Sequence, residues 1–346
     1  MANFITPRPK ITCGFLLLRN ICLIFLAIVS IGSLLLWETW KIRSSIDSIE
    51  WPLSVMTEIP SDAVTVTWLG TTTLLFDDRE TQILIDGTFT RVPTIDIILR
   101  RPVRSDIATI NYAMANFEMN RLAAIIPIHS HFDHAMDVGH VANRSSAVIL
   151  GSESTAEIAK GANVPVDQYQ VLGDGETRQF GNFKIKLITT VHAPIGLNDE
   201  EIFPGTIETP VIQPSPISSY KRGTVWSILL THPRGSTLVH GSAGIVEGKL
   251  KTESADIVLL GIGGLSRLGR DYTQKLWDET ILATGATRVI GIHHDDFSAP
   301  FGEVRAFPDL VDKVQKTAAW INDLATVQNN QVAVELPQFG RPITLY

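Results

Sequence analysis

The sequence predicts an α/β protein with two β-sheets packed face to face, helices on the outside, and one membrane-length segment in front of them. Short apolar or β-branched runs, typical of strands, alternate with stretches of helical periodicity in both halves of the chain. Each half therefore supplies a sheet, and two such sheets bury their apolar faces against each other. With 346 residues, 45% of them hydrophobic and 19% charged, the chain is long enough to bury this core.

The first element is an apolar segment near the N-terminus. Residues 21–37 carry no charge, and apolar residues extend the run upstream to Phe15 across Arg19. As a helix, the uncharged part spans about 25 Å, close to the hydrocarbon thickness of a bilayer. We expect a transmembrane anchor over residues 15–37, with a cleaved signal peptide as the alternative.

Positive charges predict the orientation of this segment. Arg8, Lys10 and Arg19 precede the uncharged run, and positive charges remain on the cytoplasmic side of a membrane. We therefore expect residues 1–14 to be cytoplasmic and the body of this single-pass protein to be extracytoplasmic.

Residues 38–60 are expected to form a linker, since they contain prolines and no sustained apolar period. The folded domain is expected over residues 61–346. Both cysteines, Cys13 and Cys22, precede that domain. A metal site within the domain must therefore use histidine and carboxylate side chains.

Strand and helix signals give the order of elements in the domain. We predict strands over residues 64–69, 73–76, 82–85, 122–128, 147–150, 183–191, 224–230, 237–240, 256–261 and 288–292. We predict helices over residues 134–143, 154–160, 272–284 and 310–324.

The charge of the chain excludes one class of function. The net charge is −7 and the chain has no long run of Lys and Arg, which argues against non-specific binding to nucleic acid. The one basic stretch, with Arg100, Arg101 and Arg104, is interpreted as a solvated loop, with a pocket rim or a lipid-headgroup contact as the alternative.

Three imidazoles and a carboxylate are concentrated in the hexapeptide that follows the apolar run 122–128. Imidazole nitrogen and carboxylate oxygen are the ligands that zinc, iron and manganese accept. Where a strand gives way to a turn and a helix, His129 and His131 reach one ion, whereas Asp133 and His134 point at a second. The hexapeptide therefore predicts a metal site.

Other histidines lie at the ends of predicted strands. His192, His240 and His293 each end a strand, and strand ends on one edge of a sheet can converge. His140, in a helix, and His232, in a hairpin turn, are expected to stay outside the metal site. Residues 194–220, rich in proline, follow His192 directly, and we expect them to form a loop or lid over the site.

With these motifs in place, residues 61–346 resemble the metallo-β-lactamase fold superfamily. The matching parts are, in order, residues 67–70 (Thr-Trp-Leu-Gly), residues 83–87 (Ile-Leu-Ile-Asp-Gly), the hexapeptide at 129–134, His192 and residues 292–293. The resemblance implies a four-layer αββα sandwich with a dinuclear centre at the sheet edges. It implies one ion on His129, His131 and His192 and a second on Asp133, His134 and His293. It also implies that Asp86 orients a ligand or the backbone beneath the site.

The sequence departs from the superfamily pattern at one turn. An aspartate that bridges both ions is usual there, but this chain reads Gly-Ser-Ala-Gly at residues 241–244. A serine hydroxyl at Ser242 is a poorer ligand than a carboxylate, so the second ion is expected to bind more weakly. Compensation by Asp295 or Asp296 is the alternative to a mononuclear site. A nucleophilic role for Ser242 is disfavoured, because its spacing is not Gly-x-Ser-x-Gly.

The resulting hypothesis is a metal-dependent hydrolase that uses metal-bound hydroxide on an ester, lactone or phosphodiester. One or two zinc ions are expected, with manganese or iron as alternatives. The hydroxide forms because a bound cation lowers the pKa of its water toward about 7. Asp133 is the candidate catalytic residue that steers the water or accepts its proton. The expected substrate is a small molecule or a lipid. The alternatives are a membrane-associated phospholipase-like phosphodiesterase and a non-catalytic metal-binding scaffold or sensor.

Overall fold

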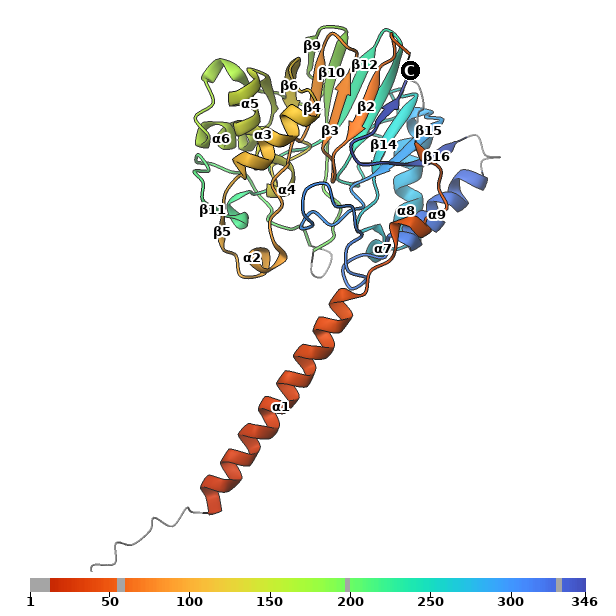
Figure 1. Ribbon diagram of the computed structural model, residues 1–346. Coiled ribbons are helices and arrows are strands. Elements are labelled where there is room, and N and C mark those ends of the chain that lie inside the picture. The colour runs from red at the N-terminus through yellow and green to blue at the C-terminus, as the bar shows by residue number, and fades with distance from the viewer. Residues whose placement is uncertain (1–12, 55–59, 197–199, 328–331) are drawn as a thin grey trace, which may run out of the picture.

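The computed structural model describes residues 13–54, 60–196, 200–327 and 332–346. Helix α1 (Cys13–Lys41) projects from the domain, and its residues from Leu17 onward form one apolar helix long enough to cross a membrane. Figure 1 shows this helix leaving the lower end of the domain. By length and composition alone, a signal sequence has the same properties.

Within the described residues, the first sheet has seven strands. In spatial order they are β17 (Pro342–Thr344), β2 (Thr65–Trp68), β3 (Leu74–Asp77), β4 (Gln82–Ile85), β6 (Leu122–Ile126), β7 (Val148–Gly151) and β8 (Tyr169–Val171). The β17 to β4 pairs are antiparallel, and the pairs from β4 to β8 are parallel.

The second sheet has eight strands in the part of the chain that the structure describes. In spatial order they are β1 (Leu53–Ser54), β16 (Ala333–Pro337), β15 (Arg288–Ile292), β14 (Ile257–Gly261), β13 (Gly235–His240), β12 (Val225–His232), β10 (Phe183–Thr190) and β9 (Thr177–Phe180). The pairs from β1 to β13 are parallel, and those from β13 to β9 are antiparallel. A separate two-stranded ribbon joins β5 (Pro102–Val103) to β11 (Ser215–Pro216).

The main core lies between the two sheets. Alternate residues of each strand, such as Trp68 and Phe76 from one sheet and Leu187 and Ile228 from the other, are buried in a single cluster. This inward alternation is what a strand with one covered face requires. The sequence prediction of two sheets packed face to face is thereby confirmed.

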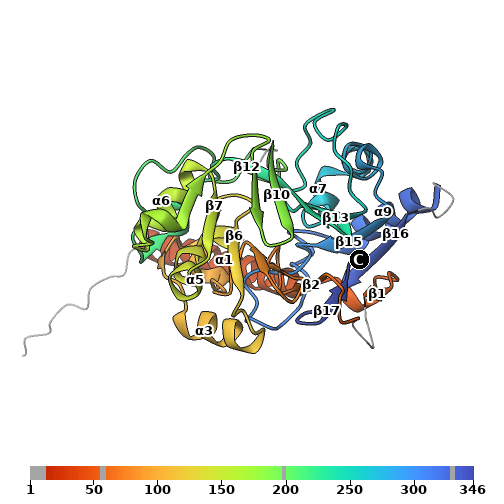
Figure 2. The same ribbon diagram turned by 90° about the horizontal axis from the view of Figure 1, so that it is seen from above.

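Helices cover the outer face of each sheet, which completes an αββα sandwich. Helices α3 (Ile107–Asn116), α5 (Val138–Ser145) and α6 (Glu153–Gly161) pack on the seven-stranded sheet. Helices α7 (Leu265–Leu268), α8 (Arg270–Trp277) and α9 (Val314–Val327) pack on the other. Figure 2 shows the two helical layers on opposite sides of the sheets. The short helices α2 (Thr94–Ile98) and α4 (Phe132–Ala135) lie in the long connections that follow β4 and β6.

Several boundaries differ from the sequence prediction. The helix predicted over residues 134–143 is two helices, α4 and α5, and the helix predicted over 272–284 passes from α8 into a π-helical turn, Asp278–Leu282. The helix predicted over 310–324 starts later, with α9 at Val314.

The segment expected to be a linker packs against the domain in its described part. It contains a 3-10 turn (Ile46–Ser48) and strand β1, which pairs with β16, and it buries Ile49 and Trp51. Residues 55–59 of that segment lie outside the described residues.

Candidate metal centre

The predicted ligands come from the ends of strands in both sheets. His129 follows β6, His192 follows β10 and His293 follows β15, and these ends meet at one edge of the sandwich. Two backbone contacts hold the hexapeptide there, because Ser130 N–H donates to Arg222 O (2.8 Å) and Trp226 N–H donates to Ile128 O (2.9 Å). Both bonds join the loop after β6 to the part of the chain at the start of β12.

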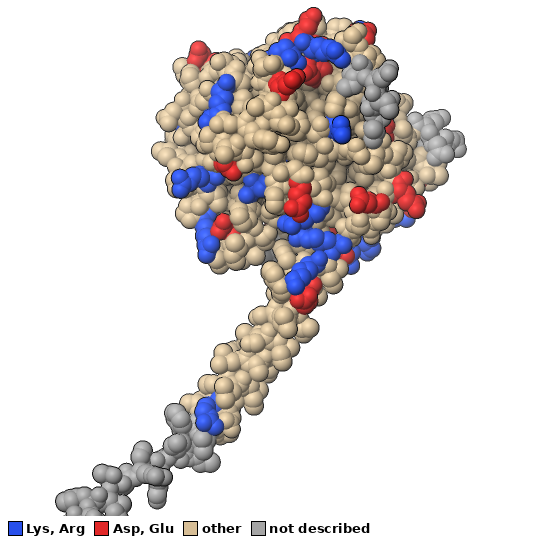
Figure 3. Space-filling model, viewed as in Figure 1, with Lys and Arg blue, Asp and Glu red and all other residues tan. Residues whose placement is uncertain are grey.

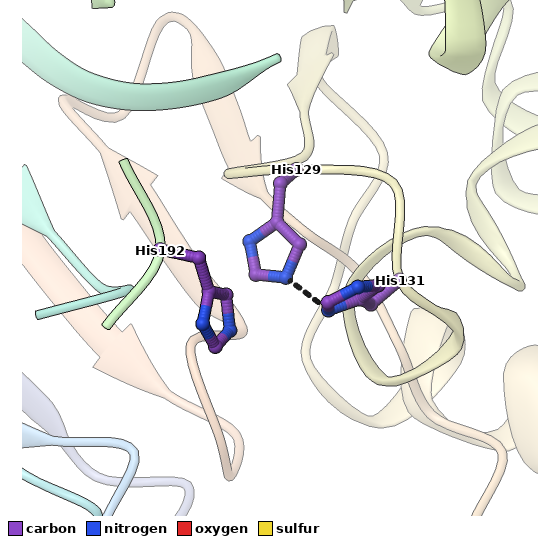
Figure 4. Close-up of side chains that lie close together, drawn as sticks. All are labelled: His129, His131 and His192. Atoms are coloured by element: carbon purple, nitrogen blue, oxygen red, sulfur yellow. Dashed lines mark hydrogen bonds between the residues drawn. The ribbon is translucent and has the colours of Figure 1, made fainter. Parts of the chain in front are cut away.

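His129, His131 and His192 form the first candidate ligand group. Their ligand atoms lie within 4.8 Å of one another, and Figure 4 shows His192 facing the other two imidazoles. His129 Nε2 lies 2.8 Å from His131 Nδ1. His192 Nδ1 is bonded to Ala193 O (2.7 Å), which leaves its Nε2 free to face the group. The structure therefore brings together the three residues assigned to the first ion.

Asp133, His134 and His293 form the second candidate group, also within 4.8 Å of one another. Asp133 Oδ2 lies 3.4 Å from His134 Nε2 and 3.7 Å from His293 Nε2. The rings of His129 and His134 are 4.1 Å apart, so the two groups are adjacent. This arrangement matches the second predicted ligand set.

Asp86 lies behind His134 of the second group, at a turn after β4 with a positive φ of 58°. One carboxylate oxygen accepts the backbone N–H of Ile128 at 2.8 Å, and the other lies 2.7 Å from His134 Nδ1. It therefore positions the start of the ligand loop and one ligand ring together, as predicted for a carboxylate beneath a metal site.

Burial keeps most of these histidines neutral, as metal binding requires. It lowers the pKa of His131 and His293 to about 4, and that of His129 well below its usual value. His134 differs: burial alone would lower its pKa, but the carboxylates of Asp86 and Asp133 outweigh it and raise the pKa to about 9. A metal ion that binds to His134 must therefore displace a proton from its imidazole.

The two groups fit a metal centre by the chemistry of their donors. One offers three imidazoles, and the other two imidazoles and a carboxylate, which are ligand sets typical of zinc or iron. His131 Nε2 and His293 Nδ1 are buried without a hydrogen-bond partner among the described residues. The opposite nitrogens, His131 Nδ1 and His293 Nε2, are the ones that lie near other candidate ligands, so the fit to a metal ion rests on the donor sets.

Ser242 contacts a predicted ligand. Its hydroxyl lies 2.9 Å from His129 Nδ1, and its side chain is buried. The structure therefore gives Ser242 a part in orienting the His129 ring, so that Nε2 faces His131. The next residue, Ala243, forms an isolated β-bridge with His192. The Gly-Ser-Ala-Gly turn therefore contacts both ligand segments of the first group.

Asp295 and Asp296, suggested as compensating ligands, lie outside both groups. Asp295 accepts the backbone N–H of Thr71 (2.8 Å). Asp296 accepts from the Ser298 backbone and hydroxyl and forms an ion pair with Arg43 (2.9 Å). Both carboxylates are thus engaged in holding loops together.

The other histidines have structural partners or lie elsewhere. His240 Nδ1 lies 2.8 Å from Ser227 Oγ, and its Nε2 lies 2.8 Å from Gly244 O, so it holds the turn that carries Ser242. His140 is on α5, and His232 ends β12 near Asp78. Neither belongs to a candidate metal group within the described ranges.

Two features of the site were not predicted from the sequence. Thr72 Oγ1 lies 2.9 Å from His134 Nδ1, and the only signal for it was a run of three threonines after Gly70. A cavity of about 170 Å³ also opens beside Asp133 and His293. Its walls are largely apolar and come from distant segments: Ile195, Ile202, Phe203, Phe297, Phe307 and Val311. Three of these belong to the segment expected to be a lid, whose residues 197–199 lie outside the description.

Comparison with known proteins gives likenesses among solved structures only. No protein-family model and no curated protein matches the sequence. The chain is similar to Igni18, a metallo hydrolase from the archaeon Ignicoccus hospitalis (15% identity, TM-score 0.48, 82% of this chain and 99% of that one). It is similar to the metallo-β-lactamase fold protein YhfI from Bacillus subtilis (16% identity, TM-score 0.46, 81% and 99%). It is also similar to CmlA, a diiron β-hydroxylase from Streptomyces venezuelae (13% identity, TM-score 0.50, 83% and 55%).

At these identities the likeness concerns the fold alone. The αββα layers and the motifs in their order along the chain show that the chain has the metallo-β-lactamase fold.

Proposed function

We propose that the protein is a metal-dependent hydrolase, anchored to a membrane by α1, that cleaves an ester, lactone or phosphodiester bond. The observation that carries this proposal is the pair of adjacent ligand groups, each within 4.8 Å, at the mouth of a cavity. A bound cation there would supply a water molecule acidified toward a pKa of about 7. Zinc suits both donor sets, and iron or manganese are the alternatives.

Asp133 is the residue proposed to handle the proton. It lines the cavity and its side chain is partly exposed, unlike that of Asp86. Burial tends to raise its pKa, but His134 and the other neighbouring imidazoles outweigh this and lower it, so the group is an ionised acceptor at neutral pH. A proton leaving an attacking water can therefore pass to Asp133.

The cavity walls indicate the kind of substrate. Apolar side chains such as Phe297 and Phe307 surround the approach to Asp133 and His293. They exclude water and favour a substrate with an apolar group next to the bond that is cleaved. Arg267, at the rim, donates to Ile195 O (2.8 Å) and so braces one wall.

A phospholipase-like phosphodiesterase is the second candidate, and the position of the anchor favours it. The wall residues Phe307 and Val311 flank a segment that is bonded to the chain directly after α1, where Asp309 N–H donates to Ile42 O (2.9 Å). If α1 spans a bilayer, the cavity is held close to lipid.

The test combines metal content with turnover. The full-length protein in detergent is expected to bind metal and to hydrolyse members of an ester, lactone and phosphodiester panel, and His129→Ala and His131→Ala should lose both properties. His140→Ala is the matched control, since His140 lies outside both groups. Headgroup release from phospholipid vesicles separates the two candidates. Metal binding without turnover on any substrate would instead favour a scaffold or sensor, and turnover unaffected by both substitutions would contradict the proposal.

A further inference from the structure

Exposed apolar side chains surround the point where α1 leaves the domain. Ile42, directly after α1, and Leu310 are each 56% exposed. They lie on neighbouring segments of the chain, because Arg43 pairs with Pro308 and Asp309 N–H donates to Ile42 O. We call the place where residues 42–43 pair with residues 308–310 the neck of the molecule. The neck therefore carries an apolar surface immediately beyond the membrane-length helix.

Helix α2 presents a second apolar surface on the same side. Ile95, Ile98 and Leu99 are 52%, 64% and 53% exposed, and their i, i+3, i+4 spacing places them on one face of the helix. Ile97 instead packs toward the core, which fixes α2 with that face outward. Figure 1 shows α2 at the lower end of the domain, the end from which α1 leaves.

Basic side chains border both apolar surfaces. Arg100 and Arg101, exposed, directly follow the exposed face of α2, and exposed Arg104 follows β5. Arg101 pairs with Asp96 on α2 (3.0 Å), whereas Arg100 and Arg104 have no ion pair among the described residues. Figure 3 shows Lys and Arg at the lower left of the domain and again around the neck. Apolar side chains flanked by arginine are the combination that binds at the interface of a bilayer with anionic lipids.

We propose that this lower side of the domain rests on a lipid bilayer, with the exposed face of α2 and the neck in the interfacial layer. We call it the bilayer face and define it by Ile42, Leu310, Ile95, Ile98 and Leu99, with Arg100 and Arg101 at its border. The proposal rests on the anchoring role given to α1 above, but not on hydrolysis. A bilayer is the occupant argued for because α1 holds this side beside one continuously.

The bilayer face has a consequence for the cavity. Phe307 and Val311, which wall it, flank the residues that pair with the neck. With the neck in the interfacial layer, the cavity lies at the lipid surface, within reach of a substrate whose apolar part remains in the bilayer.

The test measures lipid contact at single positions of the full-length chain. Cys13 and Cys22 are replaced by serine, and an environment-sensitive fluorophore is attached to Ile98→Cys or, as the matched control, to Tyr112→Cys on α3. Tyr112 is also an exposed large side chain, 61% exposed. In phosphatidylcholine vesicles containing phosphatidylserine, the label at 98 should shift to the blue and be quenched by lipids with a quencher in the upper acyl chain. The label at 112 should show neither change.

Flotation with the vesicles after an alkaline wash separates the anchor from the bilayer face. A chain that floats while its labels at 98 and 112 behave alike overturns the bilayer face and leaves the anchor standing. A chain that does not float overturns both. Shielding at 98 that grows with protein concentration, without quenching by lipid, indicates a protein partner or second copy and also overturns the proposal. Hydrolysis is not measured in any arm.

A second variant tests the positive charge at the border of the bilayer face. Arg100→Gln with Arg101→Gln should reduce the quenching at 98 in anionic vesicles and remove its sensitivity to salt, because screened attraction to the headgroups is lost. Arg178→Gln on β9 is the control, since Arg178 is also exposed and paired with a neighbouring acid. Equal effects of the two changes would contradict the assignment of Arg100 and Arg101 to the bilayer face.

Discussion

Asp86 and His134, 48 residues apart in the chain, are joined by a contact of 2.7 Å between Oδ2 and Nδ1. Both side chains are almost fully buried, and the second oxygen of Asp86 holds the backbone at Ile128. The contact fixes which imidazole nitrogen faces Asp133. A ligand ring held in one orientation loses less entropy when a cation binds.

Replacement of Asp86 by Asn is expected to weaken metal binding by about 10- to 100-fold, the usual effect of losing a carboxylate behind a ligand histidine. Titration calorimetry of the metal-free protein with zinc measures this. Asp174→Asn, at an exposed carboxylate paired with Lys249, is the control and should bind as the parent does. An unchanged affinity in Asp86→Asn would show that the His134 orientation is set by other contacts.

Replacement of Ser242 by Asp is expected to increase the number of ions bound per chain or the affinity of the weaker one. Ser242 lies beside His129 between the two strand ends, and a carboxylate there adds an anionic ligand where the chain has a hydroxyl. Elemental analysis after dialysis against limiting zinc measures the stoichiometry. Ser242→Ala, which removes the contact with His129 and adds no ligand, should bind no more than the parent. An equal number of ions per chain in the parent, Ser242→Asp and Ser242→Ala would mean that this turn does not reach the second ion.

The grouping of the candidate ligands could be predicted where they are contiguous in the sequence. Four of the six lie between His129 and His134, so local geometry alone groups them. His192 and His293 could be grouped with them because each follows a predicted strand, and strand ends on one edge of a sheet can converge. The strand β15 before His293 lies among parallel strands, whereas β10 before His192 pairs antiparallel with both neighbours. Asp295 and Asp296 show where the rule stops, since adjacency to His293 does not say which way a side chain faces. Their partners, Thr71 and Arg43, are more than 200 residues away.

The edges of the fold were less predictable than its centre. Strands β8, β9 and β17 are short, and β8 and β9 are largely solvent-facing, so they lack the apolar runs that identify central strands. Strand β1 was hidden for another reason. Its two residues gain their hydrogen bonds from β16, which follows them by more than 270 residues. Nothing local in residues 38–60 indicates that partner.

Acid is expected to destabilise the protein partly through His240. Burial lowers its folded-state pKa from 6.5 to about 4, so the unfolded state binds a proton between these values and the folded state does not. The contribution of His240 to the free energy of unfolding is fully present above pH 6.5. It decreases by about 3 kcal/mol as the pH falls to about 4. Chemical denaturation across this range should show a shallower loss in His240→Gln than in the parent. His140→Gln should follow the parent, and parallel curves for all three would contradict the assignment.

The ion pair between Arg43 and Asp296 is expected to hold the end of the anchor to the domain. Arg43 Nη1 lies 2.9 Å from Asp296 Oδ2 and also donates to Ala306 O at 2.6 Å, and the carboxylate is 4% exposed. Arg43→Met keeps the apolar stem but removes both bonds, which should lower the free energy of unfolding by about 2 kcal/mol. Lys41→Met is the matched control, because Lys41 pairs with Glu38 on the exposed surface of α1 and such pairs contribute about 0.5 kcal/mol. Limited proteolysis should cut the chain after α1 faster in Arg43→Met only, since a released neck exposes the backbone at Ile42 and Ser44. Equal cleavage rates in the two variants would mean that strand β1 and the buried Trp51 hold the neck without this ion pair.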